Sequence, residues 1–373
     1  MNVGIALLTL FPGRAGGSET YVRGLLEAFR AGEGPELATL LASSASEESL
    51  RSLEGEHVQI AAIDSYRPGN SALTRLLAME GSRLQRARLA RSVPPNLDVV
   101  HYPITVPVPD IPRVPRVVSL LDLQHHDMPE MFSAAERIFR RWAYDSSACR
   151  ATEVITITRF SAERIAEKLG LEREQIHAIH LGIDHSLFNP TQVAPLPQGL
   201  PERYIYYPAN SWPHKNHRRL TEAFESVADP ELHLLLTGAK GTAAAARSSS
   251  GRVHQLGHVP LKQVAALYRG AEALIFPSLY EGFGLPPVEA MACGCPVAAS
   301  NVGAVAEVCG DAALLFDPTD VDAISDAIVR VTSDQKLRER LRTDGLLQAA
   351  RFTWEATAQQ HLAVYRQALE RAS

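Results

Sequence analysis

The stretch ALIFPSLYEGFGLPPVEAMACGCPVAAS (residues 273–300) decides the fold. It opens with the apolar run ALIFPS and closes with PVAAS, both typical of strands buried in a sheet. Between them lie a Gly-x-Gly loop and a Pro-Pro pair, and proline is tolerated at the first positions of a helix. We therefore predict a strand to Ser278, a helix from about Pro286 and a second strand, which is the βαβ unit of a parallel sheet.

Two glutamates, Glu281 and Glu289, flank this loop eight residues apart. The predicted elements put Glu281 in the loop and Glu289 in the first helical turn, with both carboxylates at the rim above the sheet. A carboxylate can accept hydrogen bonds from two neighbouring hydroxyls, and Gly282 and Gly284 let the backbone approach a ligand closely. This chemistry suits a sugar nucleotide. An acidic residue near a helix N-terminus after a glycine turn is the alternative interpretation.

The alternation of short apolar runs with helical patterns extends along the whole chain and predicts the α/β class with parallel sheets. We expect strands at 2–11, 36–43, 57–63, 97–103, 115–123, 153–158 and 176–182, and then at 204–209, 232–238, 252–257, 273–278, 296–300 and 312–317. Helices are expected near 18–31, 71–92, 133–149, 160–169, 216–228, 261–270, 286–293, 320–332 and 334–350.

Length and a proline-rich interruption predict two domains. The 373 residues exceed what one hydrophobic core usually serves, so two domains of roughly 170 to 190 residues are expected. A segment with four prolines and no periodicity separates the two series of strands. We expect an N-terminal domain over 1–190, a linker over 191–203, a C-terminal domain over 204–352 and a terminal helix over 353–373.

The composition is that of a soluble globular protein. The chain is 46% hydrophobic and 21% charged with a net charge of −5, which disfavours bulk nucleic-acid binding. The first expected strand, which begins at residue 2, is too short and its flanks are too polar for a secretory signal or a membrane span, so a cytoplasmic location is expected. Four cysteines, Cys149, Cys293, Cys295 and Cys309, lack the spacing of a zinc or redox site and are expected to be reduced and buried.

These features together resemble the family 4 glycosyltransferases, which have the GT-B architecture of two Rossmann-like domains facing a cleft. The resemblance rests on GGSETYVRGLL (16–26), DLQHHDMPEMFS (122–133), VITITRFSAERI (154–165), HLGIDHSLFNP (180–190), YPANSWPHKN (207–216) and the E-x7-E stretch PSLYEGFGLPPVEAMACGCPV (277–297). It implies a retaining, metal-independent hexosyltransferase that needs no cofactor and uses a nucleoside diphosphate sugar, GDP- or UDP-linked.

The resemblance also assigns residues to the donor. It implies that Glu289 holds the ribose hydroxyls, while Glu281 and the backbone of Gly282, Phe283 and Gly284 contact the donor sugar and phosphates. The helix start, with Leu285, would direct free N–H groups at the diphosphate. Lys215 matches the lysine that neutralises the departing diphosphate, and Gly16 and Gly17 would face the phosphates from the other domain.

The sequence departs from the family pattern at two places. Many members carry an arginine five or six residues before the lysine, where this chain has Ala209 and Asn210; Asn210 is kept as a donor contact, and His214 or Arg218 could compensate. A histidine usually precedes the aspartate after the fifth strand, where this chain has Leu121. Asp122 and His125 are the expected catalytic residues of this loop, although His126 could face the ligands instead. The pair Asp320 and Asp322 is expected to open a helix, with Asp320 as its N-cap, and to bind no metal.

Two basic stretches bear on the acceptor, which the resemblance implies is a saccharide or a lipid-linked molecule. Basic amphipathic surfaces can lie on anionic membranes, although they can equally be solvated helix faces. One stretch interleaves arginines with aromatic residues in ERIFRRWAY (136–144). The other, which carries the expected peripheral membrane contact, holds Arg75, Arg83, Arg86, Arg88 and Arg91.

Similarity to mannosyl- and rhamnosyltransferase-like members makes GDP-mannose the first expectation for the donor, in envelope polysaccharide or glycolipid synthesis. Two rival functions stay open: a nucleotide-sugar epimerase of the same fold, and a non-catalytic protein that binds sugar nucleotides. Dinucleotide-dependent dehydrogenases are disfavoured because no G-x-G-x-x-G follows a strand.

Overall fold

The computed structural model describes residues 1–10, 16–63, 92–191, 196, 198–239 and 250–373. The chain forms two compact units, Met1–Gly182 with Trp354–Ser373, and Ile183–Thr353. The first boundary therefore falls at Gly182 instead of residue 190. Residues after Gly182 group with the second unit because Ile183 donates its N–H to the carbonyl of Phe352, at 3.1 Å, and Arg269 donates to the carbonyl of Asn189, at 3.0 Å. The second boundary falls after Thr353, one residue later than expected.

The first unit contains a seven-stranded parallel sheet in the order β3-β2-β1-β4-β5-β6-β7. Each strand was expected from its apolar run, and β1, β4, β5 and β6 are almost wholly buried, as strands covered on both faces are. Their bounds are β1 Asn2–Ala6, β2 Leu37–Ala42, β3 Val58–Ala62, β4 Val99–Tyr102, β5 Arg116–Ser119, β6 Glu153–Thr156 and β7 Ile176–Ala178.

The helices of this unit are shorter and more broken than the sequence predicted. The expected helix at 133–149 is divided by a π-helical turn over Arg141–Asp145, and the one at 71–92 lies almost entirely outside the described residues. The helices are α1 Gly17–Arg30, α2 Ser44–Leu50, α5 Gln124–Asp127, α6 Ala134–Arg140, α7 Ser146–Ala148, α8 Arg159–Leu169 and α15 Trp354–Ala372, with short 3₁₀ turns at Arg51–Leu53, Pro129–Met131 and Arg173–Gln175.

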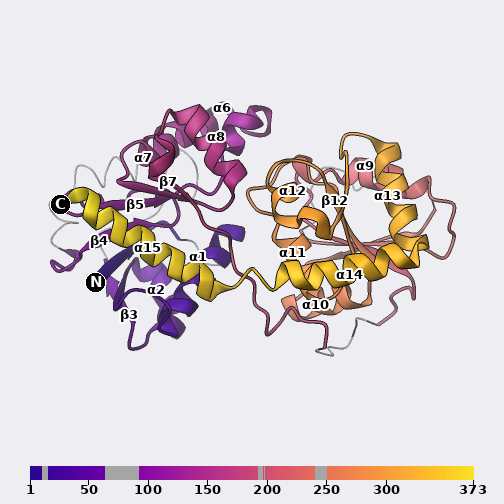
Figure 1. The fold of residues 1–373 in the computed structure, drawn as a ribbon, viewed down its shortest axis with the longest axis horizontal. Helices are drawn as coiled ribbons and strands as arrows, with labels where there is room; N and C mark the ends of the chain where they lie inside the picture. Colours follow the sequence, from indigo (N-terminus) through magenta and orange to yellow (C-terminus); the bar gives the residue numbers. More distant parts are fainter. Residues whose placement is uncertain (11–15, 64–91, 192–195, 197, 240–249) are drawn as a thin grey trace. The chain divides into compact units, whose positions relative to one another are not determined.

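The C-terminal helix α15 packs on α1, β4 and β5 of the first unit, as its yellow ribbon shows in Figure 1. A buried chain of hydrogen bonds ties it there. The hydroxyl of Tyr365 lies 2.8 Å from Nδ1 of His101, and Nε2 of His361 lies 2.7 Å from the hydroxyl of Tyr21. Gly24 of α1 is needed at this contact, because a Cβ there would overlap the ring of Trp354.

The second unit contains a six-stranded parallel sheet in the order β10-β9-β8-β11-β12-β13. Its bounds are β8 Tyr204–Pro208, β9 His233–Thr237, β10 Val253–Gly257, β11 Ala273–Phe276, β12 Val297–Ser300 and β13 Leu314–Phe316. The order reverses between β8 and β11, as it does between β1 and β4 in the first sheet. Such reversal points are where open α/β sheets bind ligands, beyond the carboxyl ends of their strands.

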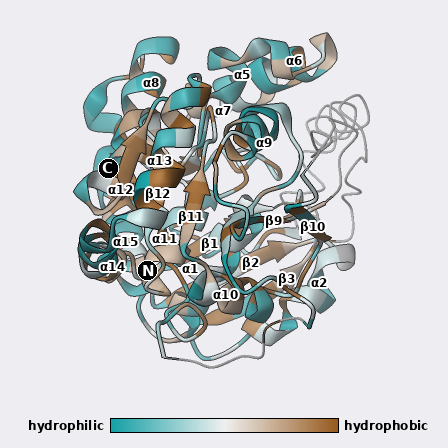
Figure 2. Ribbon diagram, turned by 90° about the vertical axis from the view of Figure 1, so that its right-hand side faces the viewer, coloured by the Kyte–Doolittle hydropathy of each residue, from teal (hydrophilic) through white to brown (hydrophobic). Residues whose placement is uncertain are grey.

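Helices connect these strands as expected, with one addition. The helices are α9 His217–Glu225, α10 Leu261–Gly270, α11 Leu285–Ala292, α12 Gly303–Cys309, α13 Val321–Ser333 and α14 Gln335–Ala349, with 3₁₀ turns at Pro213–Lys215 and Gly310–Ala312. The helix α12 was not predicted from the sequence. Its seven residues are mostly small and apolar, so they carry little helical periodicity. Figure 2 shows the apolar strands β11 and β12 with more polar helices around them.

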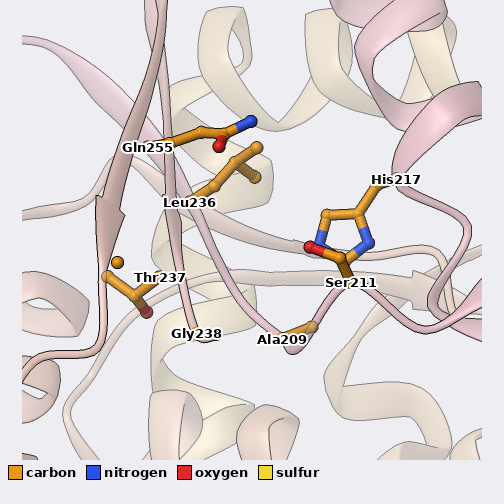
Figure 3. Close-up of a pocket in the computed structure, with 8 residues that line it drawn as sticks. Ala209, Ser211, His217, Leu236, Thr237, Gly238 and Gln255 are labelled. Atoms are coloured by element: carbon orange, nitrogen blue, oxygen red, sulfur yellow. The ribbon is translucent and has the colours of Figure 1, made fainter. Parts of the chain in front are cut away.

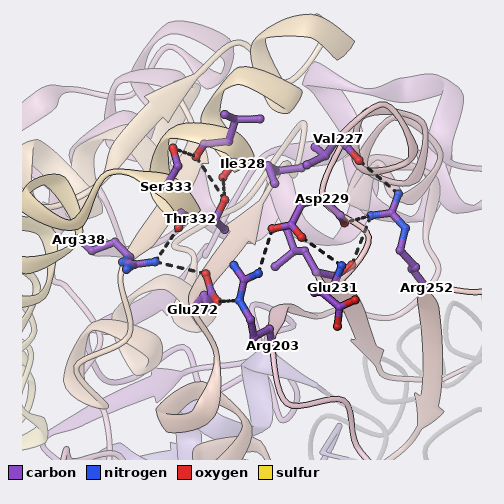
Figure 4. A network of polar contacts seen from close by, with 12 residues as sticks. Arg203, Val227, Asp229, Glu231, Arg252, Glu272, Ile328, Thr332, Ser333 and Arg338 are labelled. Atoms are coloured by element: carbon purple, nitrogen blue, oxygen red, sulfur yellow. Dashed lines mark hydrogen bonds and ion pairs between the residues drawn. The ribbon is translucent and has the colours of Figure 1, made fainter.

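A network of ion pairs closes the amino ends of the second sheet, on the side away from the carboxyl ends of the strands (Figure 4). Arg203, which precedes β8, contacts Glu272 at 2.7 Å and Asp229 at 3.1 Å. Glu272 also accepts from Arg338 of α14 at 3.3 Å. These contacts connect the starts of β8, β9 and β11 to α14 and stabilise the sheet at the edge opposite the carboxyl ends of its strands. Among the described helices, none combines the length and apolar character needed to cross a membrane.

Candidate functional site

Lys215 and Glu281 meet at the reversal point of the second sheet. Lys215 follows β8 and Glu281 follows β11, and their side chains form an ion pair with Nζ 2.5 Å from Oε1. The two side chains are 15% and 14% exposed. A partly buried cation at a ligand-binding edge, with one face still open to solvent, is suited to an anionic ligand.

The backbone around Lys215 is fixed by hydrogen bonds to neighbouring strands. Tyr207 donates its hydroxyl to the carbonyl of Lys215 at 2.8 Å. The next residue, Asn216, is buried in the left-handed region at φ 61°, which asparagine tolerates better than most residues. Its Nδ2 donates to the carbonyls of Pro277 and Pro318, at 3.0 and 2.7 Å. Lys215 is thus anchored to the ends of β11 and β13.

The glycine loop after β11 leads directly into α11. Gly284 is the N-cap at φ 97°, a conformation that favours glycine, and Phe283 packs edge-on against Phe352 with centroids 5.6 Å apart. Leu285 is the first helical residue, one position earlier than expected. Pro286 and Pro287 follow it and lack N–H groups, so this helix start offers fewer amide donors than the sequence analysis assumed.

Glu289 is the fifth residue of α11 and so lies in the second turn, not the first. Its side chain is half-buried, and Tyr268 of α10 donates a hydrogen bond to its Oε2 at 3.2 Å. Burial raises the pKa of Glu289 to about 7, and the bond from Tyr268 opposes that rise. The carboxylate therefore lies where a polar ligand can reach it, and its charge depends on pH near neutrality.

The residues expected to replace the missing arginine differ in environment. His214 is buried, and burial together with Lys215 lowers its pKa to about 4, so it is neutral at pH 7. Asn210 accepts the N–H of Ala239 with its Oδ1 at 2.7 Å. Arg218 is exposed on α9. Of these three, only Arg218 carries a charge at neutral pH.

A small hollow lies at the carboxyl ends of β8, β9 and β10 (Figure 3). Figure 3 shows Ser211 and His217 on one side of it and Leu236, Thr237 and Gln255 on the other. Its lining comprises Ala209, Ser211, His217, Leu236, Thr237, Gly238, Gln255 and Gly257. It extends the edge that carries Lys215 with a mixture of apolar surface and hydrogen-bonding groups.

In the first unit, the glycine turn follows β1. Gly16 is the N-cap of α1 at φ 52°, and Gly17 is its first residue. Ser18 is therefore the second residue of the helix and does not cap it. Both glycines are exposed, and a Cβ on either would meet no atom within 4 Å among the described residues. The start of α1 thus presents open backbone at the carboxyl edge of the first sheet.

The loop after β5 brings two histidines onto one carboxylate. Nε2 of His125 lies 2.9 Å from Oδ1 of Asp145, and Nε2 of His126 lies 2.8 Å from Oδ2. The side chain of His125 is fully buried, whereas that of His126 is 17% exposed. Asp122, two residues before the short helix α5, accepts the N–H of Gln124 with its Oδ1 at 3.0 Å. In this conformation the side chain of His126 is the more exposed of the two, whereas the sequence led us to name His125 as the catalytic residue.

His125, His126 and Asp145 have side chains of the types that can bind metal ions, and their ligand atoms lie within 4.8 Å of one another. In the structure both histidines instead lie within hydrogen-bonding distance of Asp145. A carboxylate only accepts, so each Nε2 carries a proton. Nδ1 of His125 is buried without a partner among the described residues.

The sequence also led to expectations for an aspartate N-cap, for the four cysteines and for a basic stretch, and the structure bears on the first two. Asp320 is the N-cap of α13, accepting from the N–H groups of Asp322 and Ala323, which confirms that prediction. Cys293, Cys295 and Cys309 are buried free thiols, but Cys149 is exposed. The arginines from Arg75 to Arg91 lie outside the described residues.

Three residues that contact the candidate site residues, Tyr268, Asn216 and Asp145, were not predicted from the sequence. Tyr268 lies 21 residues before Glu289, and Asp145 lies 19 or 20 residues after the two histidines, so no local spacing connects them. Asn216 adjoins Lys215, and the tolerance of asparagine for the left-handed region was the available signal.

Comparisons with known proteins agree with this geometry. Residues 190–347 match the family described as "Glycosyl transferases group 1", and residues 16–182 match the "Glycosyl transferase 4-like domain". O-antigen chain mannosyltransferase B of Escherichia coli is 31% identical over 270 residues, covering 68% of this chain and 71% of the relative. MMP alpha-(1->4)-mannosyltransferase of Mycolicibacterium hassiacum is 33% identical over 232 residues, covering 59% of this chain and 55% of that relative.

Solved structures share the fold over nearly the whole chain. Sucrose-phosphate synthase of Thermosynechococcus elongatus has a TM-score of 0.76 at 22% identity, with all of both chains covered. Anabaena HepE, solved in complex with UDP and glucose, has a TM-score of 0.70 at 19% identity, covering 98% of this chain and 100% of HepE. The chain therefore belongs to the group 1 glycosyltransferases of family 4 and has their GT-B fold.

Proposed function

We propose that this protein is a retaining, metal-independent hexosyltransferase that moves a sugar from a nucleoside diphosphate sugar to a saccharide or lipid-linked acceptor. The ion pair of Lys215 and Glu281 at the reversal point of the second sheet is the observation that carries the proposal. Mannose from GDP-mannose is the first candidate donor, since two of the relatives are mannosyltransferases. Envelope polysaccharide or glycolipid synthesis is the setting that this implies.

The nucleotide binds to the second unit in this proposal. The Glu289 oxygen that Tyr268 does not contact accepts hydrogen bonds from the ribose hydroxyls. The hollow at the ends of β9 and β10 contacts the base or the phosphates of the nucleotide. Asn210, Gly282, Phe283, Gly284 and Leu285 contribute the loops that surround the diphosphate and the sugar.

Lys215 stabilises the leaving group. During transfer, the bond between the anomeric carbon and the diphosphate oxygen breaks, and negative charge grows on the diphosphate. The acceptor hydroxyl oxygen forms the new bond on the same face of the sugar, and its proton passes to the departing phosphate. A preorganised cation aimed at that charge lowers the barrier without a metal ion. Glu281, already paired with Lys215, then contacts the sugar hydroxyls.

The first unit supplies the remaining contacts. The open backbone at Gly16 and Gly17 faces the donor phosphates, and the loop of Asp122, His125 and His126 contributes to the acceptor side. The exposed Ile138 on α6, beside the arginines of ERIFRRWAY, is consistent with a peripheral contact at the cytoplasmic face of a membrane.

A transfer assay with chelation tests this function. The purified protein is incubated with GDP-mannose, or with a panel of UDP-sugars, together with a lipid-linked saccharide acceptor and EDTA. We expect transfer that EDTA does not reduce, with the anomeric configuration of the donor kept in the product by NMR. Loss of activity with EDTA and its rescue by magnesium or manganese would contradict the metal-free mechanism, and an inverted product would contradict retention.

A further inference from the structure

Tyr268 lies behind the Glu289 carboxylate, on the helix before β11. Its side chain is fully buried, and its ring packs edge-on against Tyr206 and Phe188, with centroids 5.3 and 6.2 Å away. Its hydroxyl reaches Oε2 of Glu289 at 3.2 Å. No other hydrogen bond to this carboxylate is found in the part of the chain that the structure describes, which leaves Oε1 for a ligand.

We propose that Tyr268 is a positioning residue of the nucleotide site: its hydroxyl holds one oxygen of Glu289, favours the charged form of the carboxylate and leaves the other oxygen to the ribose. This inference rests on the proposed function, because it assumes that Glu289 contacts ribose hydroxyls. It goes further by naming the group that decides the charge and direction of that carboxylate.

The hydroxyl of Tyr268 remains a donor throughout the useful pH range. Burial, followed by the proximity of Glu289, raises its pKa well above 10. A donor that cannot lose its proton always favours the charged form of the carboxylate it contacts. Loss of this bond should therefore make Glu289 harder to ionise.

The other groups near Glu289 do not titrate near neutrality. Burial raises the pKa of Tyr206 above its ordinary value and that of Cys293 to about 12, so both stay neutral. Arg269, which lies 3.9 Å from Cys293 at its guanidinium nitrogen, stays charged. Among these neighbours Glu289 is the group with a pKa of about 7. A pH dependence of ribose binding in this range therefore reports on its carboxylate.

The competing explanation is that Glu289 serves only as the hydrogen-bond acceptor for the buried hydroxyl of Tyr268, and that Tyr268 contributes only packing to the fold. The two explanations differ in the ligand group they affect. A packing defect weakens all nucleotides alike, whereas a change in the charge of Glu289 affects only binding through the ribose hydroxyls. The ratio of the affinities for GDP and 2′-deoxy-GDP isolates this contact, because base and diphosphate are common to both. It also cancels the titration of the terminal phosphate, whose pKa is about 6.

The experiment measures this ratio by calorimetry from pH 6 to pH 9.5 in three proteins: wild type, Tyr268→Phe and Tyr204→Phe. The pair UDP and 2′-deoxy-UDP replaces the guanine nucleotides if only UDP binds. Tyr268→Phe keeps the ring and its packing. Tyr204→Phe is the matched control, since its buried hydroxyl bonds the carbonyl of Leu267 at 3.1 Å and does not touch Glu289.

In wild type we expect the ratio to fall as the pH drops through about 7. In Tyr268→Phe the fall should occur about one to two pH units higher, the shift expected for loss of a hydrogen bond to a charged group. Tyr204→Phe should keep the wild-type midpoint.

An unchanged midpoint in Tyr268→Phe, or an equal shift in Tyr204→Phe, would overturn the positioning role and leave the proposed function standing. Failure of wild type to bind either GDP or UDP would overturn the proposed function and this inference with it.

Discussion

At the scale of single residues, the ion pair of Lys215 and Glu281 is the feature proposed to interact with the donor diphosphate. Exposed ion pairs contribute little, but this pair is mostly shielded from water, so its attraction is stronger than that of a surface pair. In the proposed function, a bound diphosphate would share the Lys215 ammonium with Glu281. Since His214 is neutral at pH 7, Lys215 is the positively charged side chain of the turn Pro213–Lys215.

Lys215→Ala should therefore lower kcat more than it raises KM. The charge that Lys215 offsets is larger in the transition state than in the bound donor, and loss of one preorganised group of this kind commonly costs roughly a hundredfold to a thousandfold in rate. Steady-state kinetics with the active donor measure both constants. Lys262→Ala, on an exposed position of α10, is the matched control and should behave as wild type. A kcat for Lys215→Ala within about threefold of wild type would assign the role to Arg218 or to the start of α11.

At the scale of elements, the sequence predicted the pattern of strands and helices but not the contacts between them. The thirteen strands in the described part of the chain lie where apolar runs were found, and such runs are clearest in the central strands, which are buried on both faces of their sheets. The π-helical turn at Arg141–Asp145 was not predicted, and its last residue, Asp145, contacts His125 and His126, which belong to another segment. The bond between Tyr268 and Glu289 was not predicted either, because it joins two helices that come together only in the tertiary structure.

The docking of α15 depends on two histidines that must remain neutral. Nδ1 of His361 donates to the carbonyl of Thr357 at 2.7 Å, so its Nε2 accepts from the hydroxyl of Tyr21. Burial lowers the pKa of His361 to about 4 and that of His101 well below its ordinary value. Protonation of either ring would replace an acceptor with an unpaired buried donor.

Acid should therefore destabilise the first unit well before its carboxylates titrate. The unfolded chain binds a proton at His361 near pH 6.5 and the folded chain only near pH 4, so the contribution is complete above pH 6.5 and lost as the pH falls toward 4. The loss for this one residue is about 3 kcal/mol. Thermal melts between pH 7.5 and 4.5 should show a steep fall in Tm that is shallower in His361→Gln, whereas His258→Gln, at an exposed position, should keep the wild-type slope. Equal slopes in all three proteins would show that His361 does not set the acid sensitivity.

At the scale of the whole molecule, the two units repeat one arrangement. Each has a parallel sheet whose strand order reverses once, and in each a glycine turn follows a strand beside that reversal, at Gly16 in the first unit and at Gly282 and Gly284 in the second. The polar networks that stabilise the second unit lie at the amino ends of its strands, and the residues proposed to bind the donor lie at the carboxyl ends. Stability and ligand binding are thus assigned to opposite edges of the same sheet.

The central claim, that the second unit binds a nucleoside diphosphate through Glu289 without a metal, is tested most directly by calorimetric titration. GDP and UDP are titrated at pH 8.5 in EDTA, where Glu289 is ionised, into wild type, Glu289→Ala and the exposed control Glu222→Ala. We predict that wild type and Glu222→Ala bind one of the nucleotides equally. Folded Glu289→Ala should bind it roughly tenfold to a hundredfold more weakly, as expected for lost hydrogen bonds to a charged group. Equal affinity in Glu289→Ala, or binding by wild type only after a divalent metal is added, would contradict the account.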